Sequence, residues 1–169
     1  MEVTPRVYYL RGDMALYLVR HAQAVSRSGW DGPDEQRPLS SKGERQAEGL
    51  VGLIAGADVR RVLSSPAARC VGTVRPTAEK LGLDVKPIAA LAEGAGGKAA
   101  VALLEEQLGK KGDSVLCSHG DIIPEVLRIL AKDGVKLRDE FRWAKGSTWV
   151  FEGTGDRLSS ARYLPPPDR

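Results

Sequence analysis

Three short segments that are predicted to be buried strands constrain the fold of this 169-residue chain more than any other feature. They are residues 15–19 (ALYLV), 59–64 (VRRVLS) and 114–117 (SVLC), and polar or turn-forming residues follow each of them. Short runs of this kind are typical of strands that are covered on both faces in a parallel sheet. Segments of helical composition separate them, and strands that alternate with helices predict an α/β fold with right-handed crossovers.

The predicted helices have local start signals. The sequence SKGE at 41–44 has the spacing of a capping box. The residues expected on the buried face of the helix that it opens are Ala47, Leu50, Val51 and Ile54. We expect a kink or a break at Pro76, and we expect Asp121 to cap the last helix. The four predicted helices are 41–55, 67–81, 98–108 and 121–132.

The C-terminal part of the chain is predicted to form a hairpin. Residues 147–151 and 157–163 flank the glycine-bearing sequence GTGD at 153–156, which is typical of a hairpin loop. With a short strand at 84–88, the pattern predicts a three-layer α/β/α sandwich whose central sheet is mostly parallel and carries the hairpin at its edge. We expect one domain at 14–169, preceded by an N-terminal extension at 1–13.

Composition and charge argue against several classes of protein. Apolar residues make up 42% of the chain and charged residues 28%, as in ordinary globular domains. No apolar run reaches the roughly 20 residues that span a bilayer, and no signal peptide is recognised, so we expect a cytoplasmic protein without a membrane partner. The net charge of +3 is small for a nucleic-acid-binding protein. The two cysteines match no zinc motif, and we predict no metal and no other cofactor.

The chain has only two histidines, and both lie at the end of a predicted strand. His21 follows the first strand and His119 the third, while Arg20 precedes His21 directly and Arg69 lies shortly after the second strand. The carboxyl ends of parallel strands meet at one edge of a sheet, where ligands bind. Transfer of a phosphoryl group requires fixed positive donors and a nucleophile, and a neutral imidazole can accept it. These four side chains therefore predict a site for a phosphoryl group.

Four motifs, in their order and spacing, resemble those of the histidine phosphatase superfamily, which has the phosphoglycerate-mutase-like fold. They are LVRHA (18–22), RPLSSKG (37–43), SSPAARC (64–70) and SHG (118–120). The resemblance covers most of the chain from residue 14 onward. It implies that His21 is the phosphorylated nucleophile, that Arg20, Arg69 and His119 bind the phosphate, and that no metal is required.

The first motif departs from the family pattern after its histidine. Ala22 stands where glycine is usual, and the asparagine that often follows has no counterpart between residues 23 and 29. We predict Gln23 as the phosphate ligand in its place, with Ser26 as the alternative.

Glu93 is the best match to the proton donor of the family. A carboxylic acid can protonate the leaving oxygen of an alcohol or a sugar. The alternative is a solvated loop carboxylate, because the sequence GAGG follows at 94–97. Mutase-type relatives insert a lid between this acid and the last motif, whereas only residues 95–113 lie there in this chain. The chain therefore resembles the compact SixA-type phosphohistidine phosphatases, or the phosphatase domains joined to Nudix hydrolases.

The residues and the resemblance together predict a metal-independent phosphatase, a phosphoric monoester hydrolase that forms a phosphohistidine on His21. We expect it to act, like SixA, on phosphohistidine in a phosphoprotein. The alternatives are a small-molecule phosphatase for nucleotides or other phosphate esters and anhydrides, and a phosphate-binding module without turnover. The expected partner is a phosphorylated protein or a small-molecule phosphate, and the oligomeric state stays open.

Three further features allow two interpretations each. Trp30, in the loop that follows the first motif, either contacts substrate or packs within the protein. The basic and aromatic stretch 138–145 is either an interaction surface or part of the packing over the core. Cys70 and Cys117 adjoin the motifs and are either buried hydrophobic residues or a redox pair.

Overall fold

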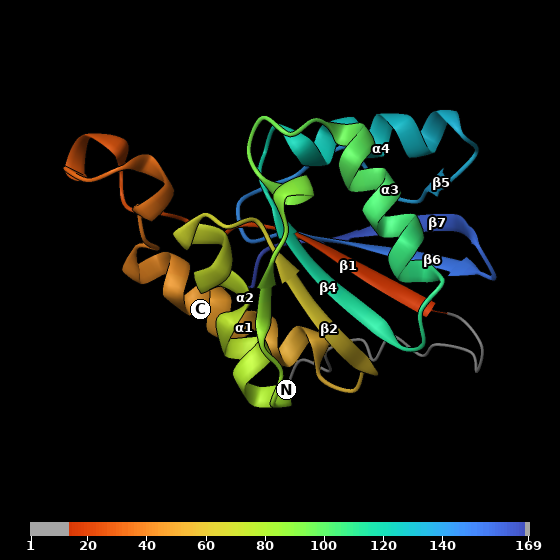
Figure 1. The fold of residues 1–169 in the computed structure, drawn as a ribbon, viewed down its shortest axis with the longest axis horizontal. Helices are drawn as coiled ribbons and strands as arrows, with labels where there is room; N and C mark the ends of the chain where they lie inside the picture. The colour runs from red at the N-terminus through yellow and green to blue at the C-terminus, as the bar shows by residue number, and fades with distance from the viewer. Residues whose placement is uncertain (1–13, 168–169) are drawn as a thin grey trace.

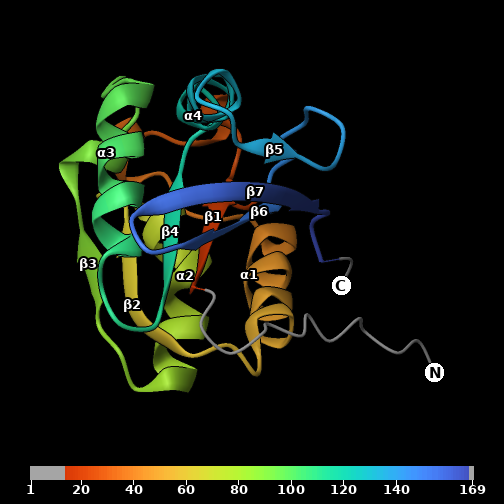
Figure 2. The same cartoon turned by 90° about the vertical axis from the view of Figure 1, so that its right-hand side faces the viewer.

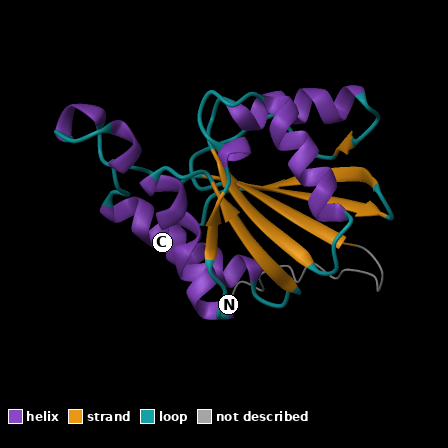
Figure 3. Ribbon diagram, viewed as in Figure 1, coloured by secondary structure: helices purple, strands orange, loops and turns teal. Residues whose placement is uncertain are grey.

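A seven-stranded sheet forms the centre of the computed structural model, which describes residues 14–167 (Figures 1 and 3). The N-terminal extension predicted at 1–13 lies outside these residues. The strands are β1 (Met14–Arg20), β2 (Val59–Ser64), β3 (Val85–Pro87), β4 (Asp113–Ser118), β5 (Lys136–Leu137), β6 (Thr148–Thr154) and β7 (Arg157–Leu164). The α-helices are α1 (Ser41–Ile54), α2 (Ala68–Leu81), α3 (Gly97–Leu108) and α4 (Ile122–Lys132).

The order of the strands brings the ends of β1, β2 and β4 together. The sheet has the order β3-β2-β4-β1-β6-β7-β5, and β4 runs parallel to both β1 and β2. Arg20 pairs with Ser118, and Ser64 pairs with Cys117. The carboxyl ends of β1, β2 and β4 are therefore level with one another along the strand direction. The residues that follow them therefore share one edge of the sheet, as predicted.

Helices cover both faces of the sheet, and each face has its own apolar core (Figures 1 and 2). Successive side chains of a strand point to opposite faces. Accordingly, Leu16 and Leu18 of β1 pack with residues of α3 and α4. Tyr17 and Val19 pack with residues of α1 and α2. The predicted three-layer α/β/α sandwich is confirmed.

The predicted C-terminal hairpin is formed by β6 and β7, which pair in antiparallel fashion. It lies beside β1, with β6 also antiparallel to β1. A two-residue strand, β5, pairs in parallel with β7 and forms the outer edge of the sheet. The sequence did not indicate β5, because a strand of two residues has no periodicity.

Two local predictions about helices need correction. Helix α1 begins at Ser41, and its cap is Ser40, whose Oγ accepts a hydrogen bond from the backbone N–H of Gly43 at 3.1 Å. The capping position is thus one residue earlier than the SKGE spacing indicated. Helix α2 passes through Pro76 as one element, so of the kink or break predicted there the break is wrong. Proline leaves the carbonyl of the residue four positions earlier, Gly72, without its helical partner, and both residues line a surface hollow where water can hydrate that carbonyl.

No helix within residues 14–167 is long and apolar enough to cross a membrane.

Candidate active site

A cavity of about 420 Å³ lies at the carboxyl ends of β1 and β4. Both histidines line it, together with Glu93 and Asp121. Its walls also carry five cationic side chains, Arg20, Arg27, Arg37, Arg69 and Lys145. The cavity is therefore suited to an anionic ligand.

His21 lies in this cavity directly after β1 and is only 7% exposed. Its backbone N–H donates to the carbonyl of Ser118 at 3.0 Å, which ties the end of β1 to the end of β4. Its Nδ1 lies 2.8 Å from the carbonyl oxygen of Ala22. A carbonyl only accepts hydrogen bonds, so Nδ1 carries the hydrogen and the Nε2 lone pair is free to react.

The pKa of His21 is lowered from 6.5 to about 3. Burial is the largest cause, the Ala22 carbonyl opposes it, and the nearby His119, Arg69 and Arg20 add to the lowering. A neutral imidazole at physiological pH is a competent nucleophile toward phosphorus. The ring of His119 faces His21, with the ring centroids 5.4 Å apart at an angle of 65°. The structure thus brings together the two histidines that the sequence separates by nearly a hundred residues.

The predicted arginines are both beside these rings. Arg69, from the first turn of α2, is 2% exposed and donates through Nη1 to the carbonyl of Asp34 at 3.0 Å. Arg20 donates through Nη1 to the carbonyl of Trp143 at 2.7 Å. The Nε–H groups of both arginines are buried and have no hydrogen-bond partner in the part of the chain that the structure describes. Such donors are costly to leave unpaired, and the oxygens of a bound phosphate can accept from them.

Thr73 connects the nucleophile loop to the helix that carries Arg69. Its hydroxyl donates to the carbonyl of Arg69 at 2.7 Å and accepts from the N–H of Ala22 at 2.9 Å. Gly120 lies against the guanidinium of Arg20. A Cβ at this position would lie 2.6 Å from Arg20 Nη2. The glycine of the SHG motif therefore makes room for the guanidinium.

Glu93 is at the cavity wall as predicted, with its side chain 49% exposed. Its Oε2 accepts from Arg69 Nη2 at 3.0 Å, and its Oε1 lies 3.9 Å from Arg27 Nη2. Asp121 supports the adjoining loop, since its Oδ2 accepts from the N–H of Gly94 at 2.8 Å. Asp121 does not cap α4 with its side chain, which corrects that prediction. The same carboxylate instead holds the loop that follows Glu93.

Gln23 does not line the cavity, in contrast to the predicted phosphate contact. Its side-chain Oε1 accepts from Ser40 Oγ at 3.0 Å, and its N–H donates to Gln46 Oε1 at 3.0 Å. These bonds fix the loop to the start of α1, so Gln23 organises the wall instead of reaching the cavity. Ser26, the predicted alternative, does line the cavity.

Sequence analysis missed three cationic residues of the cavity. Arg37 is 8% exposed and donates to Asp34 Oδ1 at 3.0 Å and to the carbonyl of Val25 at 2.8 Å. It opens the RPLSSKG motif, which was a signal for it. Lys145 ends the basic and aromatic stretch 138–145, which was interpreted as a possible interaction surface but not assigned to this site, whereas no local pattern marks Arg27.

Both tryptophans of these features have contacts within the protein. Trp30 donates through Nε1 to the carbonyl of Pro33 at 2.9 Å, within its own loop. Trp143 packs against the core and forms an edge contact with Phe141, with ring centroids 5.0 Å apart. Phe141 itself is 42% exposed.

The structure also describes the two thiols and the side chains that could bind a metal ion. Both cysteines are buried as free thiols. Within residues 14–167, no three His, Cys, Asp or Glu side chains are grouped so that they could hold a metal ion.

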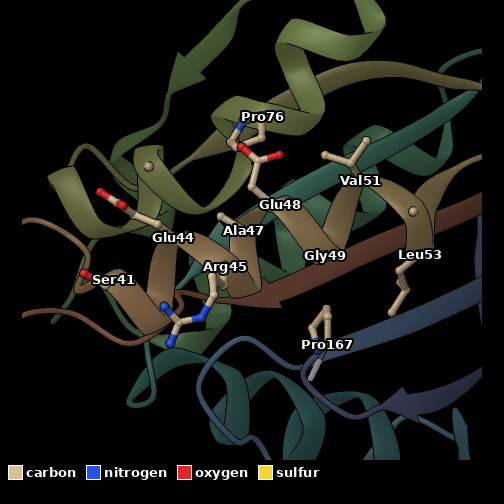
Figure 4. Close-up of a pocket in the computed structure, with 12 residues that line it drawn as sticks. Ser41, Glu44, Arg45, Ala47, Glu48, Gly49, Val51, Leu53, Pro76 and Pro167 are labelled. Atoms are coloured by element: carbon tan, nitrogen blue, oxygen red, sulfur yellow. The ribbon is translucent and has the colours of Figure 1, made fainter. Parts of the chain in front are cut away.

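A larger hollow, of about 1020 Å³, lies over the outer surface of α1 (Figure 4). Glycine and aliphatic residues line much of it, Pro167 borders it beside Gly49, and both Glu44 and Glu48 point toward the α2 side. Its acidic residues outnumber its single cation, Arg45, so it lacks the converging donors of the smaller cavity. We therefore assign the active site to the smaller cavity, which the two histidines line, and not to the larger hollow.

The fold and the cavity together define a class of protein: an α/β sandwich that presents two imidazoles, the buried Arg69 and the half-buried Arg20 at the carboxyl edge of its sheet. Comparison with known families agrees with this class. The family described as the histidine phosphatase superfamily (branch 1) matches residues 16–107, more than half of the chain. The chain belongs to this superfamily.

Individual relatives differ in their stated substrates. An 8-oxo-(d)GTP phosphatase from Mycolicibacterium smegmatis is 35% identical over 155 residues, which cover 89% of this chain and 48% of the relative. The chain thus spans about half the length of that relative. The solved structure of the protein histidine phosphatase SixA with tungstate has a TM-score of 0.72 at 16% identity, covering 92% of this chain and 97% of SixA. A protein from Nakamurella multipartitia that carries the SixA name has a TM-score of 0.70 at 23% identity, covering 93% and 98%. These two structures show that the fold is shared.

Proposed function

We propose that the protein is a phosphatase that passes a phosphoryl group from its substrate to His21 and then to water. The observation that carries the proposal is the state of His21. Its Nδ1–H is held by the Ala22 carbonyl, and its Nε2 is unprotonated in a cavity lined by His119, Arg20 and Arg69. This arrangement combines a prepared nucleophile with fixed positive donors, which is what phosphoryl transfer requires.

In the first step, the lone pair of His21 Nε2 forms a bond to phosphorus while the bond to the leaving oxygen breaks. The leaving oxygen takes the electron pair of that bond and, where it is a poor leaving group, a proton from Glu93. In the second step, water attacks the phosphohistidine and gives its proton to the Glu93 carboxylate. The P–N bond breaks, and its electrons return to His21 Nε2, so phosphate and the original enzyme are formed.

His119, Arg20 and Arg69 stabilise the negative charge that the phosphoryl oxygens carry in both steps. Arg69 already bonds Glu93 at 3.0 Å, so phosphate and the proposed proton donor meet at the same guanidinium. This geometry supports the assignment of Glu93 over a purely solvated loop carboxylate.

For the substrate, we propose nucleotides or other small phosphates as the first class to test, because the 35%-identical relative is an 8-oxo-(d)GTP phosphatase. Phosphohistidine in a protein is the second class. It is favoured by the short connection of Glu93 to α3, which begins at Gly97, so that within the described residues no lid is inserted between Glu93 and α3. A cavity without a lid can admit a protein-borne phosphoryl group.

The test of the proposal is rapid quench with an aryl phosphate. We expect a burst of phenol equal to the enzyme concentration, followed by slower turnover, and an acid-labile phosphoryl adduct at His21. A folded protein that binds phosphate but shows neither burst nor turnover with aryl phosphate, nucleotides or phosphohistidine protein would instead be a binding module. A substrate panel follows the burst and separates the two proposed classes.

Replacing Glu93 with Gln should slow the enzyme in proportion to how poor the leaving group is. We expect kcat/KM to fall about 100-fold for an alkyl phosphate, whose oxygen needs a proton, and less than about threefold for an aryl phosphate or a phosphoramidate. Glu106→Gln, which changes a carboxylate in α3 that bonds Lys110, is the matched control. An equal loss with all three substrates would argue that Glu93 only positions Arg69.

A further inference from the structure

The side chain of Ser65 contacts His119 but does not line the cavity that holds both histidines. Ser65 follows the last residue of β2 and is 1% exposed, and its N–H donates to the carbonyl of Cys117 at 2.9 Å. Its Oγ lies 2.8 Å from Nε2 of His119. This is the shortest polar contact that the structure gives to the His119 ring, and the mechanism above does not use it.

The two ring nitrogens of His119 have different surroundings. Nδ1 lies 3.5 Å from Nη2 of Arg69, on the phosphate side. A guanidinium has only donors, so this contact is favourable when Nδ1 presents its lone pair. In the neutral ring the hydrogen is then on Nε2, where it can be donated to Ser65 Oγ. The surroundings of both nitrogens therefore select the same tautomer.

Among residues 14–167, Cys70 is the only other group placed at Nε2, and its Sγ lies 3.5 Å away. Burial raises the pKa of this thiol, but its contacts with Cys117, His119 and Ser65 outweigh burial and lower the pKa to about 6. Its sulfur is therefore a second acceptor for the Nε2 hydrogen, at a longer distance than the hydroxyl of Ser65. The hydroxyl of Ser65 is closer and is fixed by a second contact, since it accepts from the N–H of Ala67 at 3.3 Å. Ser65 is thus the better partner for the Nε2 hydrogen.

We infer that Ser65 is a positioning residue for His119: it keeps the hydrogen on Nε2, so that Nδ1 is the nitrogen turned toward the phosphoryl group. The inference rests on the proposed function only for its effect on rate. When the phosphoryl group binds, Nδ1 takes up a proton from the solvent, which makes the ring a cationic donor to a phosphoryl oxygen. Ser65 Oγ continues to accept from Nε2, which stabilises the cation and prevents the ring from turning.

The chain is well suited to a direct test, because its two histidines give only two imidazole rings in a ¹⁵N NMR spectrum. We would record long-range ¹H–¹⁵N spectra at about pH 8, above the ordinary range for imidazole titration, and assign His119 from the spectrum of His21→Gln. We expect the Nε2–H tautomer for His119 in the wild type. Ser65→Ala should shift the ring toward a mixture of tautomers, and Ser65→Thr, which keeps the hydroxyl, should restore the wild-type pattern.

The rate provides a second measurement. Losing a hydrogen bond to a charged group should lower kcat about tenfold or more for an aryl phosphate, with KM changing less than about threefold. The matched control is Ser114→Ala, which removes a fully buried hydroxyl at the other end of β4, where it accepts from Arg61 Nε at 2.9 Å. That variant should keep the wild-type tautomer and kcat.

Several outcomes would overturn the inference. An unchanged His119 tautomer in folded Ser65→Ala would do so, and so would an Nδ1–H tautomer in the wild type, which needs no variant to fold. The spectra require no turnover, so they are independent of the proposed function. A protein without phosphatase activity whose His119 tautomer still responds to Ser65→Ala would refute the function and keep the positioning role.

Discussion

Replacing His21 with Gln should lower kcat by a factor of at least about 10⁴ and eliminate the acid-labile adduct, because the nucleophile itself is removed. Gln keeps a polar side chain of similar length that can still donate to the Ala22 carbonyl, so the cavity wall is preserved. The residual rate would come from Arg20, Arg69 and His119 acting on water alone. We would measure single-turnover and steady-state rates with an aryl phosphate.

The controls for this variant separate chemistry from folding. Phosphate binding by titration calorimetry should persist in His21→Gln, since the arginine donors are intact, and the circular dichroism spectrum should match the wild type. Ser114→Ala serves again as a variant with a buried polar change away from the cavity. Turnover within about tenfold of the wild type, in folded His21→Gln, would mean that the phosphoryl group goes directly to water or to another residue.

The backbone of the site could be predicted from the sequence because it follows from the topology. The segments 15–19 and 114–117 are apolar and short, so they had to be inner strands, and inner parallel strands end at one edge. His21 and His119 were placed there without knowledge of any contact, and the rings are 5.4 Å apart. Arg69 followed from the same reasoning, because α2 begins just beyond the end of β2.

What could not be predicted depends on side-chain direction and on loops. Gln23 has the right position in the chain, yet Ser40 and Gln46 bond it away from the cavity. Lys145 comes from a loop before β6, and only β6 pairing with β1 brings it to the site. The role of Ser65 depends on which nitrogen of the His119 ring its hydroxyl contacts. None of these has a periodicity or a spacing in the sequence.

The environment that prepares His21 for attack should also make the fold sensitive to acid. The pKa of His21 is lowered from 6.5 to about 3, with burial as the largest cause. Between these values the unfolded chain binds a proton that the folded protein does not, so the free energy of unfolding rises with pH in this range. The stabilisation is therefore fully present above about pH 6.5 and is lost as the pH falls toward 3. One proton corresponds to about 1.4 kcal/mol per pH unit, which amounts to several kcal/mol over the range.

Urea unfolding of the wild type and of His21→Gln, at intervals from about pH 7 to about pH 4, would measure this contribution. We expect the wild type to lose stability faster on acidification, by about 1.4 kcal/mol per pH unit relative to the variant below pH 6. The contributions of other groups to the pH dependence cancel in the difference between the two proteins. One of these groups is Asp113: burial raises its pKa, so its contribution has the opposite sign. Parallel pH profiles for the two proteins would show that His21 is protonated in the folded state near its ordinary pKa. The same result would remove the physical basis for a neutral, nucleophilic Nε2, so a stability measurement without any substrate tests the central premise of the mechanism.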